Sequence, residues 1–171
     1  MIKVFLVEDE VVMRNGIKNN IPWEKEGLIF AGEASDGELA YPMIKKAQPD
    51  ILITDIRMPF MDGLELSELV KKEFPKIKII ILSGYNEFDY AKQAIHIGVT
   101  DYLLKPITAS KLLEAVKKVA DVIEKEREEE GMLERYRLEM AENTVLERQR
   151  LFRDLVTSRI NFKEALERGE E

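Results

Sequence analysis

Residues 51–55, Ile-Leu-Ile-Thr-Asp, form a short and almost continuous apolar run that ends in a carboxylate. A run of this kind is typical of a strand in a parallel sheet, where helices cover both faces. Four other runs rich in β-branched residues lie at 2–7, 28–32, 77–82 and 99–103, and segments of helical periodicity separate them. This alternation predicts an α/β fold, with a doubly wound parallel sheet of five strands between two layers of helices.

The helices carry start signals of their own. Asp62 and Glu65 have the spacing of a capping box, which predicts the start of a helix near 64, and Thr108 is a suitable cap for the last helix. That last helix has an apolar face, which is made by Leu112, Val116, Val119 and Ile123. We expect this face to pack on the sheet and to close a domain over 1–123.

The remaining residues, 124–171, predict a helical extension of different character. Charged residues fill 124–130 without interruption, and Gly131 precedes a second helical pattern. Glycine costs roughly 1 kcal/mol relative to alanine inside a helix, so a break at Gly131 and a continuous exposed helix both remain open. Apolar residues recur at intervals of seven, at Leu138, Val145 and Phe152, with Leu155 and Val156 beside them. The repeat indicates a coiled coil or an antiparallel helix contact, although polar residues interrupt its companion positions.

Composition excludes several classes of function. The net charge of −7 divides into −4 over 1–106 and −3 over 107–171, and neither part contains a basic patch, so we expect no binding to DNA by this chain alone. Cysteine is absent, which excludes disulfides and thiolate metal sites. The apolar run at 2–7 is too short for a signal peptide or a membrane span, and we expect a cytoplasmic location without membrane contact.

Functional groups gather at the carboxyl edge of an open α/β sheet, and four of the predicted strands lead into them there. They are Glu8-Asp9-Glu10 after the first strand, Asp55 at the end of the third, Ser83 after the fourth and Lys105 after the fifth. Three carboxylates held close together raise one another's pKa unless a cation relieves them. Mg²⁺ suits such an oxygen-only site, and an Asp55 oxygen can then attack phosphorus. Lys105 and Ser83 would contact the phosphoryl oxygens, and the backbone carbonyl of Arg57 could complete the metal shell.

Four motifs in this order resemble the receiver domains of bacterial response regulators, over residues 1 to about 123. They are Val-Glu-Asp-Glu (7–10), Thr-Asp-Ile-Arg-Met-Pro-Phe-Met-Asp-Gly (54–63), Ser-Gly-Tyr (83–85) and Tyr-Leu-Leu-Lys-Pro (102–106). The resemblance implies the flavodoxin-like strand order 2-1-3-4-5 and a signalling protein, not an enzyme. It also implies that a sensor histidine kinase phosphorylates Asp55.

The same resemblance implies a role for each site residue. Glu8 and Asp9 would bind Mg²⁺, Ser83 and Lys105 would contact the phosphate and take part in the switch, and Tyr102 would be the switch aromatic. It further implies a cis peptide bond between Lys105 and Pro106. Glu8 departs from the family, since many members have Asp there, but it keeps the charge and should reach the metal through water.

A narrower resemblance concerns the output. Ile-Pro-Trp at 21–23 with Gly27, and the stretch 83–94, resemble the receiver subclass that has an AraC-type helix-turn-helix output. Residues 151–160 are similar to the linker of those proteins, so we expect a chain that ends within the linker and reaches DNA only through a missing output domain. We expect a homodimer, formed through the C-terminal helices or through the face of the fourth helix, fifth strand and fifth helix.

Plainer interpretations exist for each residue taken alone. Acidic loop residues are often solvated, Asp55 could cap a helix, and Ser83 could satisfy a local backbone group. Tyr102 could be ordinary packing, as we expect for Trp23, Phe88 and Tyr90, and we expect the single histidine, His96, on the surface. Two rival functions remain. One is a phosphohydrolase of the haloacid-dehalogenase type, which would need an Asp where Arg57 stands. The other is a receiver that is not phosphorylated, but no acidic or lysine position is missing.

Overall fold

The computed structural model describes residues 1–84 and 88–167 and divides the chain into two compact units, Met1–Glu124 and Lys125–Glu171. Two parts of the sequence predictions lie outside the described residues. These are positions 85–87 of the motif that begins at Ser83 and the last four residues of the predicted extension. The expected packing role of the Phe88 side chain also lies outside them.

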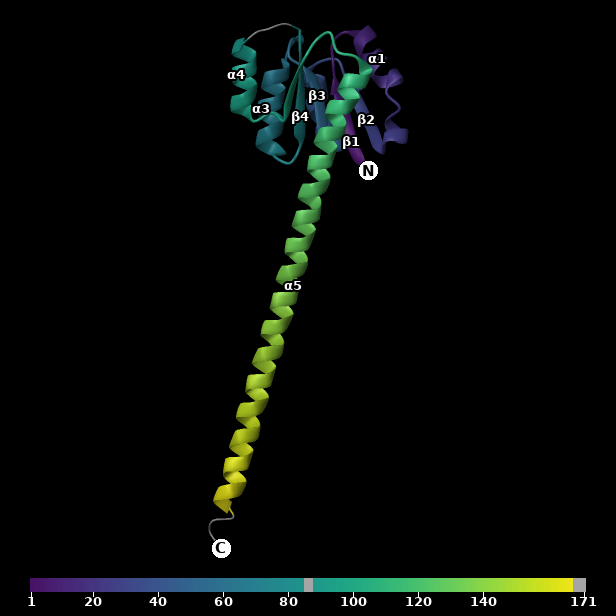
Figure 1. Cartoon of the computed structure of the whole chain (residues 1–171). Coiled ribbons are helices and arrows are strands. Elements are labelled where there is room, and N and C mark those ends of the chain that lie inside the picture. Colours follow the sequence, from purple (N-terminus) through teal and green to yellow (C-terminus); the bar gives the residue numbers. More distant parts are fainter. Residues whose placement is uncertain (85–87, 168–171) are drawn as a thin grey trace. The chain divides into compact units, whose positions relative to one another are not determined.

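The first unit is built on a five-stranded parallel sheet (Figure 1). Its strands are β1 (Ile2–Val7), β2 (Leu28–Ala34), β3 (Ile51–Asp55), β4 (Lys78–Ser83) and β5 (Asp101–Leu104). The helices are α1 (Val11–Asn20), the short 3₁₀ helix η1 (Trp23–Glu26), α2 (Gly37–Ala47), α3 (Gly63–Glu73), α4 (Phe88–Ile97) and α5 (Ala109–Glu167). The spatial order β2-β1-β3-β4-β5 confirms the predicted doubly wound fold.

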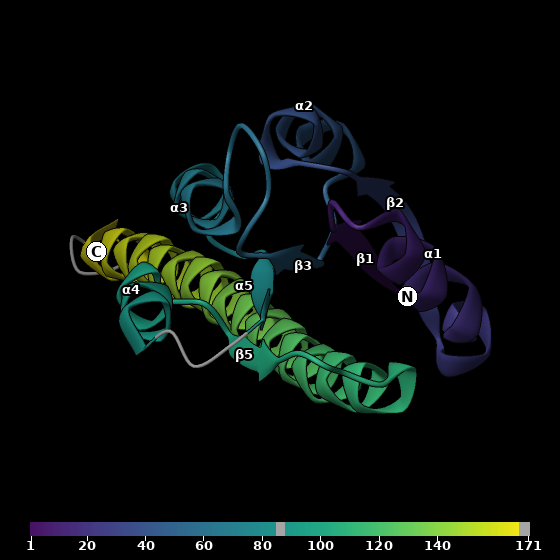
Figure 2. The same ribbon diagram turned by 90° about the horizontal axis from the view of Figure 1, so that it is seen from above.

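Alternating side chains of the strands supply two separate hydrophobic cores. On β1, for example, Val4 and Leu6 face one core, while Phe5 and Val7 face the other. The first core is closed by α1 and the start of α5, and the second by α2, α3 and α4 (Figure 2). The predicted apolar face of the last helix is confirmed, because Leu112, Val116, Val119 and Ile123 are all buried in the first core.

Two strand boundaries differ from the prediction by two residues, for local reasons. β2 runs on to Ala34 because its register with β1 shifts by one residue between Phe30 and Gly32, after which the pairing resumes. β5 begins later than predicted, at Asp101, because the backbone N–H of Val99 donates to the Ala94 carbonyl and closes the end of α4. Chain reversals of this kind depend on backbone hydrogen bonds that the order of apolar residues does not encode.

The predicted helix caps are present. Asp62 accepts hydrogen bonds from the backbone N–H groups of Leu64 and Glu65, each at 2.8 Å, and the Glu65 carboxylate accepts from Asp62 N at 3.2 Å. This is the reciprocal arrangement of a capping box. The Thr108 hydroxyl accepts from the backbone N–H of Lys111 at 3.2 Å. Both caps fix loops that lie at the carboxyl edge of the sheet.

The question left open at Gly131 is answered by α5, which continues through this residue to Glu167. In the second unit the apolar side chains of the predicted seven-residue repeat are exposed: Leu138 by 57%, Val145 by 54% and Phe152 by 71%. None of the helices within 1–84 and 88–167 combines the length and apolar character that a membrane crossing requires. The coiled-coil contact itself stays a prediction.

Gly63 marks the closest approach between a helix and the sheet. A Cβ atom at this position would lie 1.8 Å from the Asp55 carbonyl oxygen, and the backbone N–H of Gly63 donates to the Ile56 carbonyl at 2.8 Å. No side chain fits there without moving the end of β3. The glycine therefore allows α3 to begin directly against the strand that carries Asp55.

We expect Gly63→Ala to lower the free energy of unfolding by about 3 kcal/mol, because the new methyl group overpacks a contact with backbone atoms. The measurement is urea denaturation followed by the fluorescence of Trp23, the only tryptophan, which is buried. Gly16→Ala is the matched control. A Cβ there meets only the end of Asn20 at 3.9 Å, so the same substitution should stabilise α1 by about 0.5–1 kcal/mol. Equal effects at the two positions would contradict the close approach.

Candidate functional site

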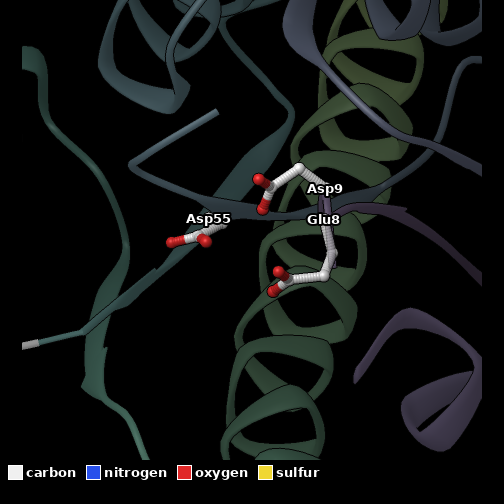
Figure 3. Close-up of side chains that lie close together, drawn as sticks. All are labelled: Glu8, Asp9 and Asp55. Atoms are coloured by element: carbon white, nitrogen blue, oxygen red, sulfur yellow. The ribbon is translucent and has the colours of Figure 1, made fainter. Parts of the chain in front are cut away.

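Two neighbouring strand ends bring the three predicted carboxylates together. Glu8 and Asp9 follow β1 directly, and Asp55 is the last residue of β3, which pairs with β1. One carboxylate oxygen from each residue lies within 4.8 Å of the others. Figure 3 shows that Glu8 and Asp9 turn their carboxylates toward Asp55 from the same loop. The cluster therefore forms from residues that are almost fifty positions apart in the sequence.

Lys105 completes the cluster from the loop after β5. Its Nζ atom donates to Glu8 Oε2 and to Asp55 Oδ2, each at 2.8 Å. Glu8 is fully buried, Asp55 is 7% exposed, and the Lys105 side chain is 17% exposed. A buried carboxylate is costly without a partner. The Lys105 ammonium group compensates the charges of both Glu8 and Asp55.

Burial and hydrogen bonding together shift the pKa values of Glu8 and Lys105. Loss of solvent raises the pKa of Glu8 above its ordinary value, against the opposing effect of the Lys105 hydrogen bond. Burial alone would lower the pKa of Lys105, but the hydrogen bonds from its ammonium group to Asp55 and Glu8 outweigh that effect and raise it. Lys105 therefore stays cationic, and Glu8 is the carboxyl group whose ionised form is disfavoured by burial.

The two oxygens of Asp55 have different partners. Oδ1 accepts from the backbone N–H of Ile56 at 2.7 Å, and Oδ2 accepts from Lys105. Asp55 borders a cavity of about 260 Å³, which is large compared with the roughly 30 Å³ that a water molecule occupies in the liquid. The other lining residues are Ile56, Arg57, Ser83, Gly84, Tyr90 and Lys105.

The remaining predicted residues fall into two groups. Ser83 and Arg57 line the cavity, and the Ser83 carbonyl accepts from the backbone N–H of Lys105 at 2.7 Å. The peptide bond between Lys105 and Pro106 is cis, as predicted. Tyr102 lies outside the cavity wall and packs half-buried on the second core, where its buried hydroxyl has no hydrogen-bond partner among the described residues.

Sequence reasoning missed two residues that shape the site. Tyr90 was expected only to pack, yet it borders the cavity, and its ring centre lies 5.9 Å from the Arg57 guanidinium carbon. Arg14 was not considered, yet its Nη1 atom donates to the Glu8 carbonyl at 2.6 Å. A side chain that binds backbone leaves no motif in the sequence, although Arg14 does stand one helical turn after Glu10 at the start of α1.

The donor set is compatible with a hard divalent cation. Its ligands are carboxylate oxygens alone, from Glu8, Asp9 and Asp55, with no nitrogen or sulfur donor in the cluster. Mg²⁺ prefers such ligands and usually keeps several waters. An exposed Asp9 and an open cavity beside Asp55 leave room for water and for phosphoryl oxygens.

Comparison with known proteins identifies relatives of this chain. The sequence profile of the response regulator receiver domain matches residues 4–117. The uncharacterized transcriptional regulatory protein YesN of Bacillus subtilis is 41% identical over 119 residues, which are 70% of this chain and 32% of YesN. The transcriptional regulatory protein HptR of Staphylococcus aureus is 39% identical over 112 residues, 66% of this chain and 44% of HptR. The chain thus spans about a third to a half of these relatives.

Solved structures agree with the sequence relatives. The receiver domain of AraT, a response regulator from Geobacillus stearothermophilus, has a TM-score of 0.69 at 39% identity and covers 74% of this chain and 98% of its own. A two-component transcriptional regulator AraC from Clostridium phytofermentans has a TM-score of 0.65 at 31% identity, with the same coverage.

The raised pKa of Glu8 leads to a prediction about stability. The folded state binds the Glu8 proton more tightly than the unfolded state does, so the ionised carboxylate lowers stability at neutral pH, and this penalty disappears as the pH falls below the ordinary value of 4.5. We expect Glu8→Gln to raise the free energy of unfolding at pH 7 in buffer free of divalent ions, and the gain to shrink toward pH 4.5. Urea denaturation across this range measures it.

The exposed neighbour Glu10 supplies the control, since Glu10→Gln removes the same charge without relieving a buried one. A loss of stability in Glu8→Gln at pH 7 would mean that the ion pair with Lys105 outweighs the cost of burial.

Proposed function

The chain belongs to the response regulator receiver domain family, and on this premise we propose that it is the phosphoryl-accepting input of a two-component system, with Asp55 as the acceptor. The observation that carries the proposal is the buried cluster of Asp55, Glu8 and Lys105 beside an open cavity. Receiver domains interact with sensor histidine kinases, and the relatives are named as transcriptional regulators. We infer that a histidine kinase, or a small acyl phosphate, is the donor.

The transfer requires positioning and charge compensation more than covalent chemistry. A carboxylate oxygen of Asp55 attacks phosphorus, a new O–P bond forms, and the P–N bond to the kinase histidine or the P–O bond of the acyl phosphate breaks. The Ile56 N–H holds Oδ1, while Lys105 stands beside Oδ2, where it can neutralise phosphoryl oxygens. Ser83 offers its hydroxyl from the wall of the same cavity.

Mg²⁺ is the proposed cofactor. Glu8, Asp9 and Asp55 would hold it together with the backbone carbonyl of Arg57. When bound, the ion supplies positive charge that lowers the repulsion between the carboxylates and the incoming phosphate. One carboxylate oxygen from each of these three side chains already lies within 4.8 Å of the others.

The phosphoryl group would act as a switch because it adds about 1.5 to 2 negative charges at one point. A backbone hydrogen bond joins Ser83 to Lys105. Movement of the Lys105 ammonium group toward the phosphate would therefore also displace the ends of β4 and β5. Tyr102 belongs to β5, and its buried unpaired hydroxyl favours a second position with a partner. A shift between two such states would alter the face of α4, β5 and α5.

The proposed architecture is a receiver domain over 1–123 and a helical extension over 124–171. An AraC-type output domain that follows the extension would bind DNA, in keeping with the Clostridium neighbour, a two-component transcriptional regulator AraC. The phosphorylated form would be a homodimer, joined by the extension or by the face of α4, β5 and α5, and it would work in the cytoplasm.

The chain would be a signalling protein and not a turnover enzyme. A phosphohydrolase that uses an aspartyl phosphate needs a second acid two residues after the nucleophile, and Arg57 occupies that position. Release of many equivalents of phosphate per chain would revive this rival. A receiver that is never phosphorylated is the other alternative, and failure of beryllofluoride to bind at Asp55 would favour it.

The central test is phosphorylation with acetyl phosphate and Mg²⁺. We expect intact mass spectrometry to show one phosphoryl group per chain, and we expect Asp55→Asn to show none because the attacking oxygen is lost. Asp121→Asn is the control, since it makes the same change at an exposed position of α5. Full labelling of Asp55→Asn would exclude Asp55 as the acceptor.

A second test addresses the dimer. Sedimentation velocity of the wild type should show a shift from monomer to dimer when beryllofluoride is added. Val145→Glu places a charge on the apolar repeat of the extension and should keep the protein monomeric, whereas Asn143→Glu, at another exposed position of the same helix, should still dimerise.

Each other result of the sedimentation experiment has a definite meaning. A beryllofluoride-dependent dimer in Val145→Glu would assign the contact to the face of α4, β5 and α5. A wild type that is monomeric in both states would contradict the homodimer.

A further inference from the structure

Arg14 reaches from α1 to the backbone of the loop that presents two of the three carboxylates. Its Nη1 atom lies 2.6 Å from the carbonyl oxygen of Glu8 and 3.5 Å from that of Asp9. The Arg14 side chain is only 16% exposed, and its contact with the Glu8 carbonyl is partly buried, whereas the longer one with Asp9 is exposed. Hydrogen bonds from a charged donor are about twice as strong as neutral ones.

The Glu8 side chain also contributes hydrogen bonds to this loop: its Oε1 atom accepts from the backbone N–H of Glu10 at 3.3 Å, and its Oε2 atom accepts from Lys105. Glu10, at the N-cap position of α1, makes no side-chain capping hydrogen bond, and the first turn of α1 contains no acidic residue. A cation near a helix N-terminus is itself unfavourable because it opposes the helix dipole. Arg14 stands close to that end, so its contacts with the loop carbonyls have to outweigh an electrostatic cost.

Glu33 on β2 forms a long ion pair with the guanidinium group. Its Oε1 atom lies 4.0 Å from Arg14 Nε, and its Oε2 atom lies 3.3 Å from Lys18 Nζ. Glu33 pairs with Leu6 in the sheet, so the anchor belongs to the strand beside β1. Arg14 therefore contacts both this strand and the loop after β1.

We propose that Arg14 is a positioning residue for the cation site: by binding the carbonyls of Glu8 and Asp9, it fixes the loop so that both carboxylates face Asp55. Glu33 acts through Arg14. This inference rests on the proposed function, because it assumes that a divalent cation binds these carboxylates. Outer contacts that orient metal ligands are typically worth 10–100-fold in metal affinity.

The direction of the effect separates this role from simple electrostatics. Arg14 carries a positive charge close to a proposed cation site, so removal of the charge alone would strengthen cation binding. Loss of positioning would weaken it. The sign of the change in affinity therefore decides between the two.

Calorimetric titration with Mg²⁺ measures that change. We expect Arg14→Met to weaken Mg²⁺ binding 10–100-fold, Glu33→Gln to weaken it less, and Arg14→Lys to be intermediate, because lysine keeps the charge but loses the fork of donors. Lys25→Met, which removes one positive charge from an exposed residue of η1, should stay within about twofold of the wild type. Circular dichroism checks the fold, and if Arg14→Met does not fold, Arg14→Lys and Glu33→Gln carry the test.

The labelling rate with acetyl phosphate gives an independent readout. With positioning lost, Arg14→Met should need more Mg²⁺ for half-maximal labelling but should reach a similar rate at saturation. Unchanged or tighter Mg²⁺ binding in Arg14→Met, or in Arg14→Lys and Glu33→Gln together, would overturn the inference. A wild type that neither binds Mg²⁺ nor is labelled would instead refute the proposed function, so the two failures are distinguishable.

Discussion

The Lys105 ammonium group joins three strand ends that are far apart in the sequence. It lies 2.8 Å from a carboxylate oxygen of Glu8, which follows β1, and 2.8 Å from one of Asp55, which ends β3. Without a cation between them, two buried carboxylates would repel each other and lose their hydration together. The carboxyl edge of the sheet can therefore be acidic and buried at once only because the loop after β5 returns a lysine to it. The cavity, the cis bond beside Lys105 and the link to β4 all lie around this one ion pair.

Most of the fold follows from the chemistry of single segments. Continuous apolar runs, helix caps and the order of strands and helices leave few topologies open, and the rule that ligands gather at the carboxyl edge then selects Glu8, Asp9, Asp55 and Lys105 without an atomic structure. What the sequence could not supply depends on backbone atoms. The register shift of β2, the late start of β5 and the contact of Arg14 with the Glu8 carbonyl are decided by where N–H and C=O groups point.

The extension shows a limit of another kind. Local propensity left both a break at Gly131 and an unbroken helix open, since a single glycine costs only roughly 1 kcal/mol. The helix continues through Gly131, and its apolar side chains in the second unit of the chain are exposed. Because helices in proteins gain most of their stability from packing, the cost of one glycine does not by itself decide whether this helix continues.

Asp55 is enclosed on its backbone side. Gly63 leaves no space for even a methyl group against the Asp55 carbonyl oxygen, which also accepts a hydrogen bond from the Thr54 hydroxyl. The main chain at Asp55 is therefore closely packed. Under the proposed function, the acceptor would keep its position, and the response would come from Ser83 and Lys105, at the ends of β4 and β5. Retention of the phosphoryl group and relay of the signal would then depend on different strands, so that mutation would adjust one without altering the other.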